Sequence, residues 1–259
     1  MPRLTVKEVL ESKGKRKMTM VATSDHDTAQ ACEEAEIDMI CCSEVGLPLV
    51  RRGAPNLFIR PGLPISKIVA SDDESIRASY ALMEQGADAV HMISNPHRIR
   101  AVAEMRIPVC GHVGMVPAYQ TWLGGFRAVG KTANEAVRVY EEVLAIQEAG
   151  AFAVEIEVVP ERIAAEIAKR VEIFVIGIGS GSQCDCELLF AVDLLGRHKG
   201  HYPRHAKKYR NQYQDTVEAF SEFRRDVDSG SFPTRNHKVA IKEAEFERFL
   251  ETIDKSSHE

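Results

Sequence analysis

Two glutamates stand two residues apart in an apolar run of the chain, AVEIEVVP (153–160). Successive side chains of a strand point to opposite faces, so Glu155 and Glu157 share one face. A strand that is buried on both faces carries carboxylates only where they are paired or reach a polar cavity. We expect at least one of them to have a functional role. The alternative is an internal salt bridge to an arginine or a lysine.

A histidine ends a second apolar run, in IPVCGHVGMVP (107–117). This histidine, His112, is a candidate for a functional site. A lone buried histidine is more often structural, but Gly111 and Gly114 lie on either side of this one. We interpret these glycines as leaving room for a ligand to approach the backbone.

Two further stretches carry weaker indications of a binding site. The run IGIGSGS (176–182), which includes Gly179 and Ser180, resembles glycine-rich loops that bind phosphate or carboxylate. A tight strand-to-helix turn is the alternative. The run Cys184-Asp185-Cys186 lacks a second pair of soft ligands at matching spacing, so we interpret its cysteines as reduced core residues rather than as a metal site.

The elements that must position these groups are short apolar segments separated by amphipathic stretches. Clear helical patterns cover 72–85, 133–149 and 161–170. The apolar segments are rich in β-branched residues and lack strict alternation, which indicates parallel strands buried on both faces. Eight of them are predicted strands: 18–24, 38–44, 56–62, 88–94, 107–113, 151–159, 172–179 and 190–196. Eight strands favour an α/β fold of the (β/α)₈ TIM-barrel type over a doubly wound open sheet.

The predicted barrel forms a single domain over residues 1–259, with a C-terminal helical extension from about residue 206. The crossover between the second and third strands is shortened to LPLVRRGAP (47–55), too short for a full crossover helix. In a barrel, reactive groups lie at the C-terminal ends of the strands. The candidate groups at those ends, besides His112 and Glu157, are Ser24, Asp25, His26, Ser43, Glu44, Arg60, His91 and Ser94.

Composition and charge narrow the class of partner. The chain has 259 residues, 44% of them apolar, and a net charge of −5, which argues against general affinity for nucleic acid or an anionic membrane. No apolar run approaches the roughly 20 residues that span a bilayer, and the N-terminus lacks the apolar core of a signal peptide. We expect a cytoplasmic protein that acts on a small molecule. The basic stretch 197–210 is interpreted as a solvated helix start or a subunit contact.

Several motifs occur in a characteristic order: RRGAPN (51–56), PVCGHVGMVP (108–117), GGFRAVG (124–130), IEVVP (156–160), VIGIGSGSQCDCELL (175–189), GHYPRHAKKY (200–209) and SGSFPTRNH (229–237). In this order they resemble the ketopantoate hydroxymethyltransferases of the isocitrate lyase and phosphoenolpyruvate mutase superfamily. The resemblance extends from about residue 4 to about residue 237.

The resemblance implies a (β/α)₈ barrel that is decameric in bacterial members, and a magnesium-dependent aldol reaction. A one-carbon unit from 5,10-methylenetetrahydrofolate is added to C3 of 2-oxoisovalerate (3-methyl-2-oxobutanoate), a 2-oxo acid, in pantothenate biosynthesis. His112 matches the family histidine that contacts the substrate, and Glu157 matches the glutamate given an acid/base role in enolisation.

The metal region departs from the family pattern. Ser43, Gly62 and Ile93 occupy the three positions where the family has carboxylates. Glu44 stands at the family's substrate-binding serine, and His91 at its substrate lysine. Magnesium prefers carboxylate oxygens, so the ordinary site cannot be assembled. A borderline ion such as Zn²⁺ or Mn²⁺ would have to use Glu44, Asp25 and the histidines instead; Asp25 matches an aspartate of the family's first-strand motif.

Two interpretations follow. In the first, the chain is an enzyme that enolises a 2-oxo acid and forms or cleaves a C–C bond, with Glu157 as the base and with His112 and His91 stabilising the enolate. The residues predicted to bind substrate are then Asp25, Ser43, Glu44, Ser94, Gly179 and Ser180. In the second, the chain is a non-catalytic paralogue, a binding or regulatory subunit that keeps the barrel and the oligomer surface.

Overall fold

Eight parallel strands close into a barrel, in which β1 is hydrogen-bonded to β8 as well as to β2. The computed structural model describes residues 3–63, 71–93 and 95–256. The strands are β1 (Met18–Ala22), β2 (Met39–Ser43), β3 (Phe58–Gly62), β4 (Val90–His91), β5 (Val109–Gly114), β6 (Ala153–Glu157), β7 (Phe174–Ile178) and β8 (Cys186–Phe190). The predicted TIM barrel is confirmed, and the open-sheet alternative is wrong.

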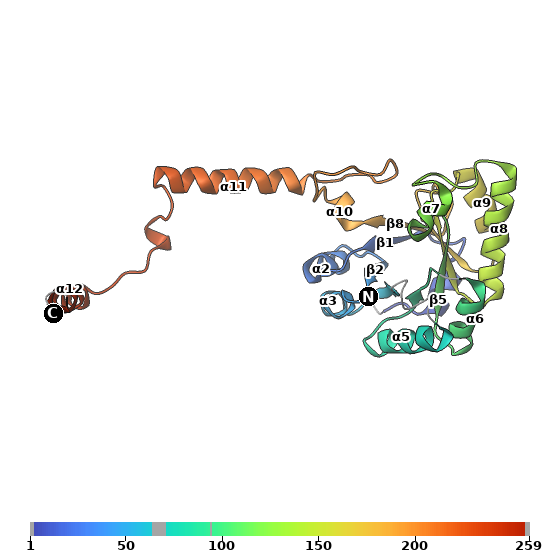
Figure 1. The fold of residues 1–259 in the computed structure, drawn as a ribbon, viewed down its shortest axis with the longest axis horizontal. Helices are drawn as coiled ribbons and strands as arrows, with labels where there is room; N and C mark the ends of the chain where they lie inside the picture. The colour runs from blue at the N-terminus through green and yellow to red at the C-terminus, as the bar shows by residue number, and fades with distance from the viewer. Residues whose placement is uncertain (1–2, 64–70, 94, 257–259) are drawn as a thin grey trace. The chain divides into compact units, whose positions relative to one another are not determined.

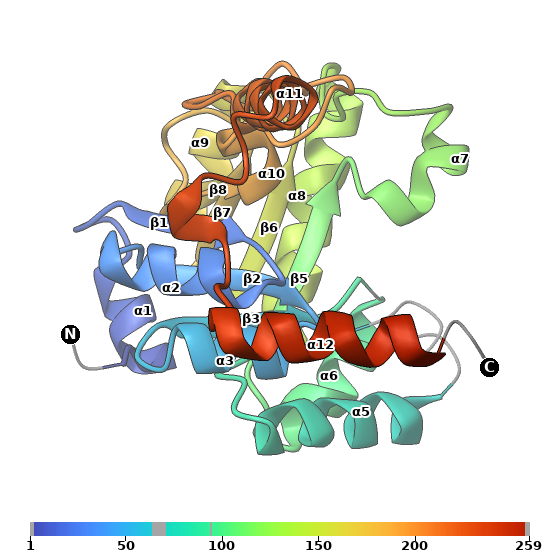
Figure 2. The ribbon, with the colours of Figure 1, turned by 90° about the vertical axis from the view of Figure 1, so that its left-hand side faces the viewer.

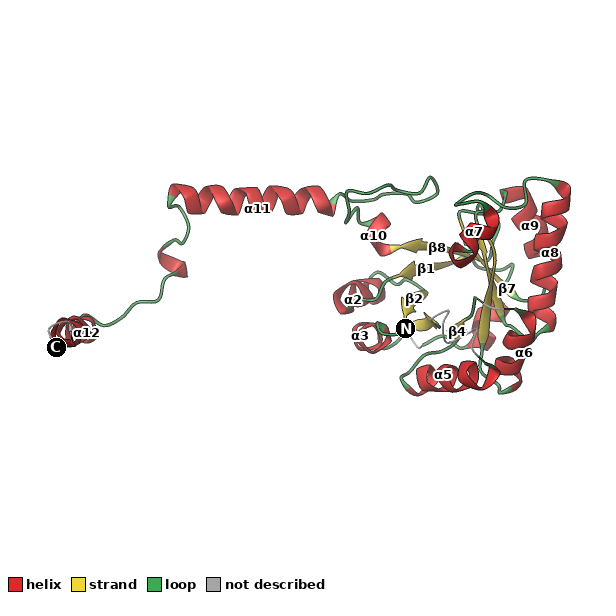
Figure 3. Cartoon of the chain, viewed as in Figure 1, coloured by secondary structure: helices red, strands yellow, loops and turns green. Residues whose placement is uncertain are grey.

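Helices surround the strands (Figures 1 and 3). Those of the barrel unit are α1 (Val6–Ser12), α2 (His26–Glu34), α3 (Leu47–Gly53), α5 (Asp72–Glu84), α6 (Pro96–Glu104), η1 (Pro117–Tyr119), α7 (Gln120–Leu123), α8 (Ala133–Glu148), α9 (Glu161–Arg170) and α10 (Ala191–Leu194). Figure 2 shows α8 and α9 behind the strands and α5 and α6 below them. The three clearest predicted helices correspond to α5, α8 and α9.

Contacts divide the chain into two units, Met1–Arg210 and Asn211–Glu259. The first contains the barrel. The second contains α11 (Gln212–Ser229), η2 (Arg235–His237) and α12 (Glu243–Ser256), the helices that the sequence placed beyond about residue 206. None of the described helices combines the length and the apolar character needed to cross a bilayer.

Local signals in the sequence explain where several helices begin. The side chain of Ser71 accepts a hydrogen bond from the backbone of Glu74 and caps α5. Asn95 and Thr132 cap α6 and α8 in the same way. Such caps provide acceptors for backbone N–H groups that have no partner within the helix. The capping residue therefore fixes the position at which each helix begins.

The connection between β2 and β3 is short but helical. It contains the seven-residue helix α3. A Cβ atom on Gly53 would lie 2.3 Å from the carbonyl oxygen of His26, so glycine allows α3 to pack closely against α2. The shortened crossover is therefore confirmed, and it is accommodated by close packing of two helices.

The prediction for the eighth strand, 190–196, is wrong. The strand is Cys186–Phe190, and the apolar residues that follow it form the helical turn α10. Cys186 and Leu188 belong to the apolar cluster inside the barrel, whereas the charged Glu187 between them interrupts the apolar run. The Asp185 carboxylate accepts a hydrogen bond from the backbone of Val175 and holds the start of β8 beside β7.

Apolar side chains fill the barrel on one side of the candidate site. This inner cluster includes Met18, Met20, Met39, Phe58 and Phe174, all with at most 2% of their surface exposed. A second apolar cluster lies between the strands and the surrounding helices. The buried polar side chains of Arg60, His91, Glu155 and Glu157 therefore lie in a barrel whose interior is otherwise packed with apolar side chains.

Candidate active site

An arginine and a glutamate form an ion pair inside the barrel. Arg60 projects from β3, and its Nη2 contacts Oε1 of Glu155 on β6. The Arg60 side chain is 0% exposed and that of Glu155 is 4% exposed. Burial of two charges costs several kcal/mol for each ion, so each requires the other. The salt-bridge alternative foreseen for the glutamate pair is thus realised at Glu155.

The electrostatics of the pair keep both groups charged. Burial by itself would raise the pKa of Glu155, but Arg60 and the neighbouring imidazoles of His91 and His112 outweigh it and hold the pKa well below its usual range. Burial would likewise lower the pKa of Arg60, and Glu155 reverses this. An anion with so low a pKa is a poor acceptor of a substrate proton at neutral pH.

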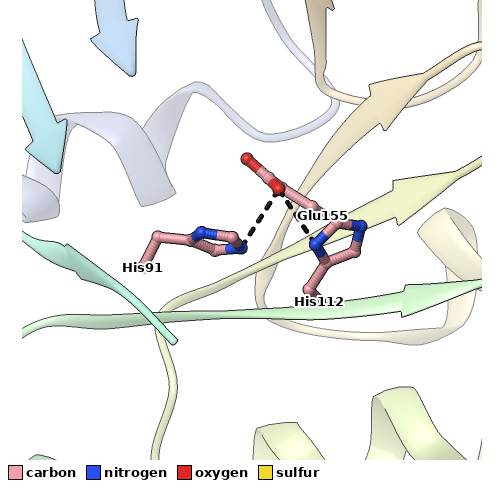
Figure 4. Close-up of side chains that lie close together, drawn as sticks. All are labelled: His91, His112 and Glu155. Atoms are coloured by element: carbon pink, nitrogen blue, oxygen red, sulfur yellow. Dashed lines mark ion pairs between the residues drawn. The ribbon is translucent and has the colours of Figure 1, made fainter. Parts of the chain in front are cut away.

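Two histidines flank the second oxygen of the same carboxylate. His91 Nε2 lies 3.1 Å from Glu155 Oε2, and His112 Nδ1 lies 3.4 Å from it. Figure 4 shows the two rings turned toward this oxygen, and their centroids are 5.3 Å apart. Burial lowers the pKa of His91, although Glu155 opposes the change, so this ring is neutral at pH 7.

The far side of His112 contacts the other glutamate. His112 Nε2 lies 3.0 Å from Glu157 Oε2, at the C-terminal end of β6. Strand register explains the arrangement: His112 pairs with Glu155, and Gly114 pairs with Glu157. Glu157 has no arginine partner among the described residues. Of the two glutamates, it is therefore the better placed to accept a proton.

Protein atoms pack closely against the two glycines beside His112. A Cβ on Gly111 would lie 2.8 Å from the Ile146 side chain of α8, outside the barrel. Gly114 has φ +89°, and a Cβ there would lie 2.4 Å from the carbonyl oxygen of Glu157. Packing thus accounts for both glycines, and Gly114 also lines a cavity beside β5, so their role in leaving room for a ligand stays a prediction.

The predicted substrate-binding residues at the ends of the first two strands have local partners. Asp25 caps α2 by accepting from the backbone of Thr28, and it also contacts Arg197. The Ser43 hydroxyl lies 3.0 Å from that of Ser24. Glu44 follows Ser43 in a turn and is partly buried. The roles of Asp25, Ser43 and Glu44 in substrate binding stay predictions.

The glycine-rich loop is organised by its own hydrogen bonds. The Ser180 hydroxyl donates to the carbonyl of Ile156 and accepts from the backbone of Val159, which ties the end of β7 to β6. Gly179 has φ +64°, and a Cβ there would lie 2.6 Å from the ring of His205. The fully described stretch 179–185 leads into β8 without a helix. Ser94 lies outside the described residues.

One group among the described residues has the geometry of a metal site. It consists of His91, His112 and Glu155, whose ligand atoms all lie within 4.8 Å of one another. Neither Glu44 nor Asp25 is part of this group. The sequence provided the two histidines and placed Arg60 among the groups at the strand ends, but it did not pair Arg60 with Glu155.

A cavity adjoins the C-terminal end of β5. It has a volume of about 730 Å³ and is bounded by β5, the segment around α7, and α8. His112, Tyr119, Trp122 and Arg138 contribute to its lining. Its size lies within the range of small-molecule sites, and the 91% exposed Trp122 stands at its edge.

Comparisons with known proteins agree on a family. The family model of ketopantoate hydroxymethyltransferase matches residues 46–235. The 3-methyl-2-oxobutanoate hydroxymethyltransferase of Kosmotoga olearia is 32% identical over 89% of this chain and 95% of its own length. The enzyme of the same name from Thermotoga maritima is 32% identical over 92% of this chain and 97% of its own length.

Solved structures share the fold at much lower identity. A 2,3-dimethylmalate lyase of the PEP mutase/isocitrate lyase superfamily aligns with a TM-score of 0.59 at 11% identity, over 99% of both chains. A phosphonopyruvate hydrolase in complex with oxalate and Mg²⁺ aligns with a TM-score of 0.57 at 13% identity, over 97% of this chain and 98% of that one.

Proposed function

The chain belongs to the ketopantoate hydroxymethyltransferase family, and from this premise we propose that it enolises a small 2-oxo acid and forms or cleaves a C–C bond at C3. The reaction in the names of its relatives is hydroxymethyl transfer to 3-methyl-2-oxobutanoate. The observation that carries the proposal is that the two glutamates have different charged partners. Glu155 is neutralised by Arg60, while the one ion pair of the Glu157 side chain among the described residues is with His112.

Proton abstraction is the step that these residues support best. Glu157 would take the C3 proton of the 2-oxo acid, and the C–H electron pair would form the C2=C3 bond as negative charge moves onto the keto oxygen. The imidazoles of His91 and His112 beside the Glu155 carboxylate would stabilise that oxygen, while the charge of Arg60 is balanced by Glu155. In the family reaction the enolate then attacks the one-carbon unit, which 5,10-methylenetetrahydrofolate supplies when bound.

The ordinary magnesium site does not fit this chain. Strand register places Ser43 beside Gly62, and Gly62 beside His91, at the ends of β2, β3 and β4. Ser43, Gly62 and Ile93 stand where the family pattern has carboxylates, and none of the three is an acid. Magnesium demands oxygen ligands and usually takes carboxylates, so no step of the proposal is assigned to it.

A second candidate function rests on the same substitutions. The loss of three carboxylates and of the substrate lysine supports a non-catalytic paralogue that binds the 2-oxo acid or regulates a partner. Both candidates predict a bound small molecule, but only the enzyme exchanges the C3 proton.

We also propose that the protein is a homo-oligomer, decameric as the resemblance implies. Apolar side chains recur at helical spacing along α11, at Val217, Phe220 and Phe223, which supports burial of this face against protein. Sedimentation equilibrium would measure the subunit number, and a monomer at micromolar concentration would contradict the proposal.

An isotope-exchange experiment tests the proposed function. The protein is incubated in D₂O with 3-methyl-2-oxobutanoate or a related 2-oxo acid, with and without Mg²⁺, Mn²⁺ or Zn²⁺, and the C3 proton is followed by NMR. We expect exchange that is lost in Glu157→Gln and kept in Glu104→Gln, a matched change on the exposed end of α6. Absence of exchange with every acid and metal, combined with retained binding, would favour the paralogue.

A further inference from the structure

We propose that His91, His112 and Glu155 form a binding site for one divalent transition-metal ion of the zinc class, made from residues other than those of the family's magnesium site. The ligand atoms would be His91 Nε2, His112 Nδ1 and Glu155 Oε2, from β4, β5 and β6. Binding of the ion stands on geometry alone. Its part in catalysis would rest on the proposed function.

The separations of the ligand atoms suit a small ion. Zinc binds imidazole nitrogen and carboxylate oxygen at about 2.0–2.2 Å, and a tetrahedron with such bonds has edges of roughly 3.3–3.6 Å. Glu155 Oε2 lies 3.1 Å from His91 Nε2 and 3.4 Å from His112 Nδ1. These two edges match within a few tenths of an ångström.

Hydrogen bonding alone does not account for the cluster. His91 Nε2 and His112 Nδ1 are buried and have no aligned hydrogen-bond partner among the described residues, even though both lie close to the Glu155 carboxylate. The His112 side chain is only 4% exposed. Buried polar atoms are rarely left without a partner, and an ion between them would satisfy both nitrogens.

The orientation of His112 has the form usual for a metal-bound imidazole. Its Nδ1 faces the cluster, while its Nε2 lies 3.0 Å from Glu157 Oε2 on the opposite side, close enough for a hydrogen bond but not aligned for one. Histidine ligands commonly direct their second nitrogen at a carboxylate, which fixes the ring and increases its basicity. Glu157 would therefore be a positioning residue for the ion as well as the proposed base.

The chemistry of the donors selects the class of ion. Two imidazoles and one carboxylate are a set that binds zinc and similar borderline ions, with a position left for a substrate oxygen, whereas magnesium prefers oxygen donors. Glu155 and Glu157 carry two negative charges against the one positive charge of Arg60, so the surroundings favour a cation.

The neighbouring strand has room for this arrangement. A Cβ on Gly62 would lie 3.6 Å from His91 Nδ1, so the absent side chain at position 62 leaves space beside the imidazole. The loss of a carboxylate at position 62 and the presence of histidine at position 91 are thus linked. In this chain the proposed metal ligands lie on β4, β5 and β6, whereas the family pattern has carboxylates at the ends of β2 and β3.

Metal binding can be tested without substrate, so its outcome is separate from that of the exchange experiment. Protein treated with EDTA is titrated with Co²⁺ or Zn²⁺, followed by visible absorption of Co²⁺ and by calorimetry. We expect one equivalent to bind, with excess Mg²⁺ failing to displace it. His91→Gln and His112→Gln should weaken binding at least a hundredfold, Glu157→Gln about ten- to a hundredfold, and the surface control His26→Gln not at all.

X-ray absorption of the wild-type Zn²⁺ complex identifies the atoms that bind the ion, and this measurement does not depend on whether a variant folds. Nitrogen and oxygen ligands at about 2.0–2.1 Å support the site, whereas sulfur at about 2.3 Å would assign the ion to cysteines. Sulfur ligation, absence of stoichiometric binding, or unchanged affinity in folded histidine variants would each overturn the inference.

Discussion

The Arg60 guanidinium contacts Glu155 Oε1 within the barrel and leaves Oε2 facing His91 and His112. One contact therefore has two effects. It neutralises a buried carboxylate that would otherwise be costly, and it separates the roles of Glu155 and Glu157. The Arg60–Glu155 ion pair therefore distinguishes Glu155, the proposed metal ligand, from Glu157, the proposed base.

Breaking the ion pair should destabilise the fold. Arg60→Met leaves the Glu155 charge buried and unpaired, so we expect the free energy of unfolding to fall by about 3–5 kcal/mol. The double variant Arg60→Met/Glu155→Leu should recover most of that loss, because neither charge remains. Urea unfolding of the single and double variants measures the coupling, and additive losses would contradict the pairing.

Removal of the proposed base should affect turnover more than binding. In Glu157→Gln the side chain keeps its size but accepts no proton, so we expect kcat to fall at least about a hundredfold with a much smaller change in KM. Steady-state kinetics with the 2-oxo acid that shows exchange measures both constants. An unchanged kcat would assign proton abstraction to another group.

The glycine before His112 should be required for packing. The added methyl group of Gly111→Ala would press on the Ile146 side chain, at a cost of about 1–3 kcal/mol in the free energy of unfolding. Ile146→Val in the same chain should restore part of it by removing a methylene group. If Gly111→Ala instead weakens substrate binding at unchanged stability, the glycine serves a ligand after all.

The stability of the protein should depend on pH through Glu187. Burial raises the pKa of this glutamate from 4.5 to about 7, with Lys17 opposing and Glu161 adding to the change. Between pH 4.5 and 7 the folded state holds a proton that the unfolded state has lost, so the free energy of unfolding decreases as pH rises through this range.

Glu187→Gln should remove that dependence and stabilise the protein at pH 8 relative to wild type. The side chain is 40% exposed and its charge is screened, so we expect a gain of at most about 1 kcal/mol. Urea unfolding at pH 5 and pH 8 measures it. If the free energy of unfolding of the wild-type protein increased from pH 5 to pH 8, the raised pKa of Glu187 would be contradicted.

Magnesium binding should be recoverable by design. Ser43→Asp, Gly62→Asp and Ile93→Glu together return three carboxylates to the positions of the family pattern, and among the described residues the nearest atom to a Cβ at position 62 is His91 Nδ1, at 3.6 Å. We expect the triple variant to bind Mg²⁺ in calorimetry and the wild type not to do so. Tight Mg²⁺ binding by the wild type would show that the loss of these carboxylates has been compensated elsewhere.

Local patterns predicted most of the fold because they are set by nearby residues. Apolar segments located β1 to β7, and helical periodicity located α5, α8 and α9. The eighth strand escaped prediction because Glu187 interrupts its apolar run and the following residues 190–196 read as a better strand. A short strand that carries a partly exposed charged residue, as β8 carries Glu187, has no local sequence pattern that distinguishes it from a loop.

The sequence by itself determined the barrel, the common face of Glu155 and Glu157, and the presence of His112 near them. Only the tertiary structure decided which glutamate is neutralised and which imidazoles meet, because Arg60 and Glu155 are 95 residues apart along the chain. It also decided that Gly111 packs against Ile146 of α8. Periodicity is a property of adjacent residues, whereas these contacts depend on how distant strands align around a closed barrel.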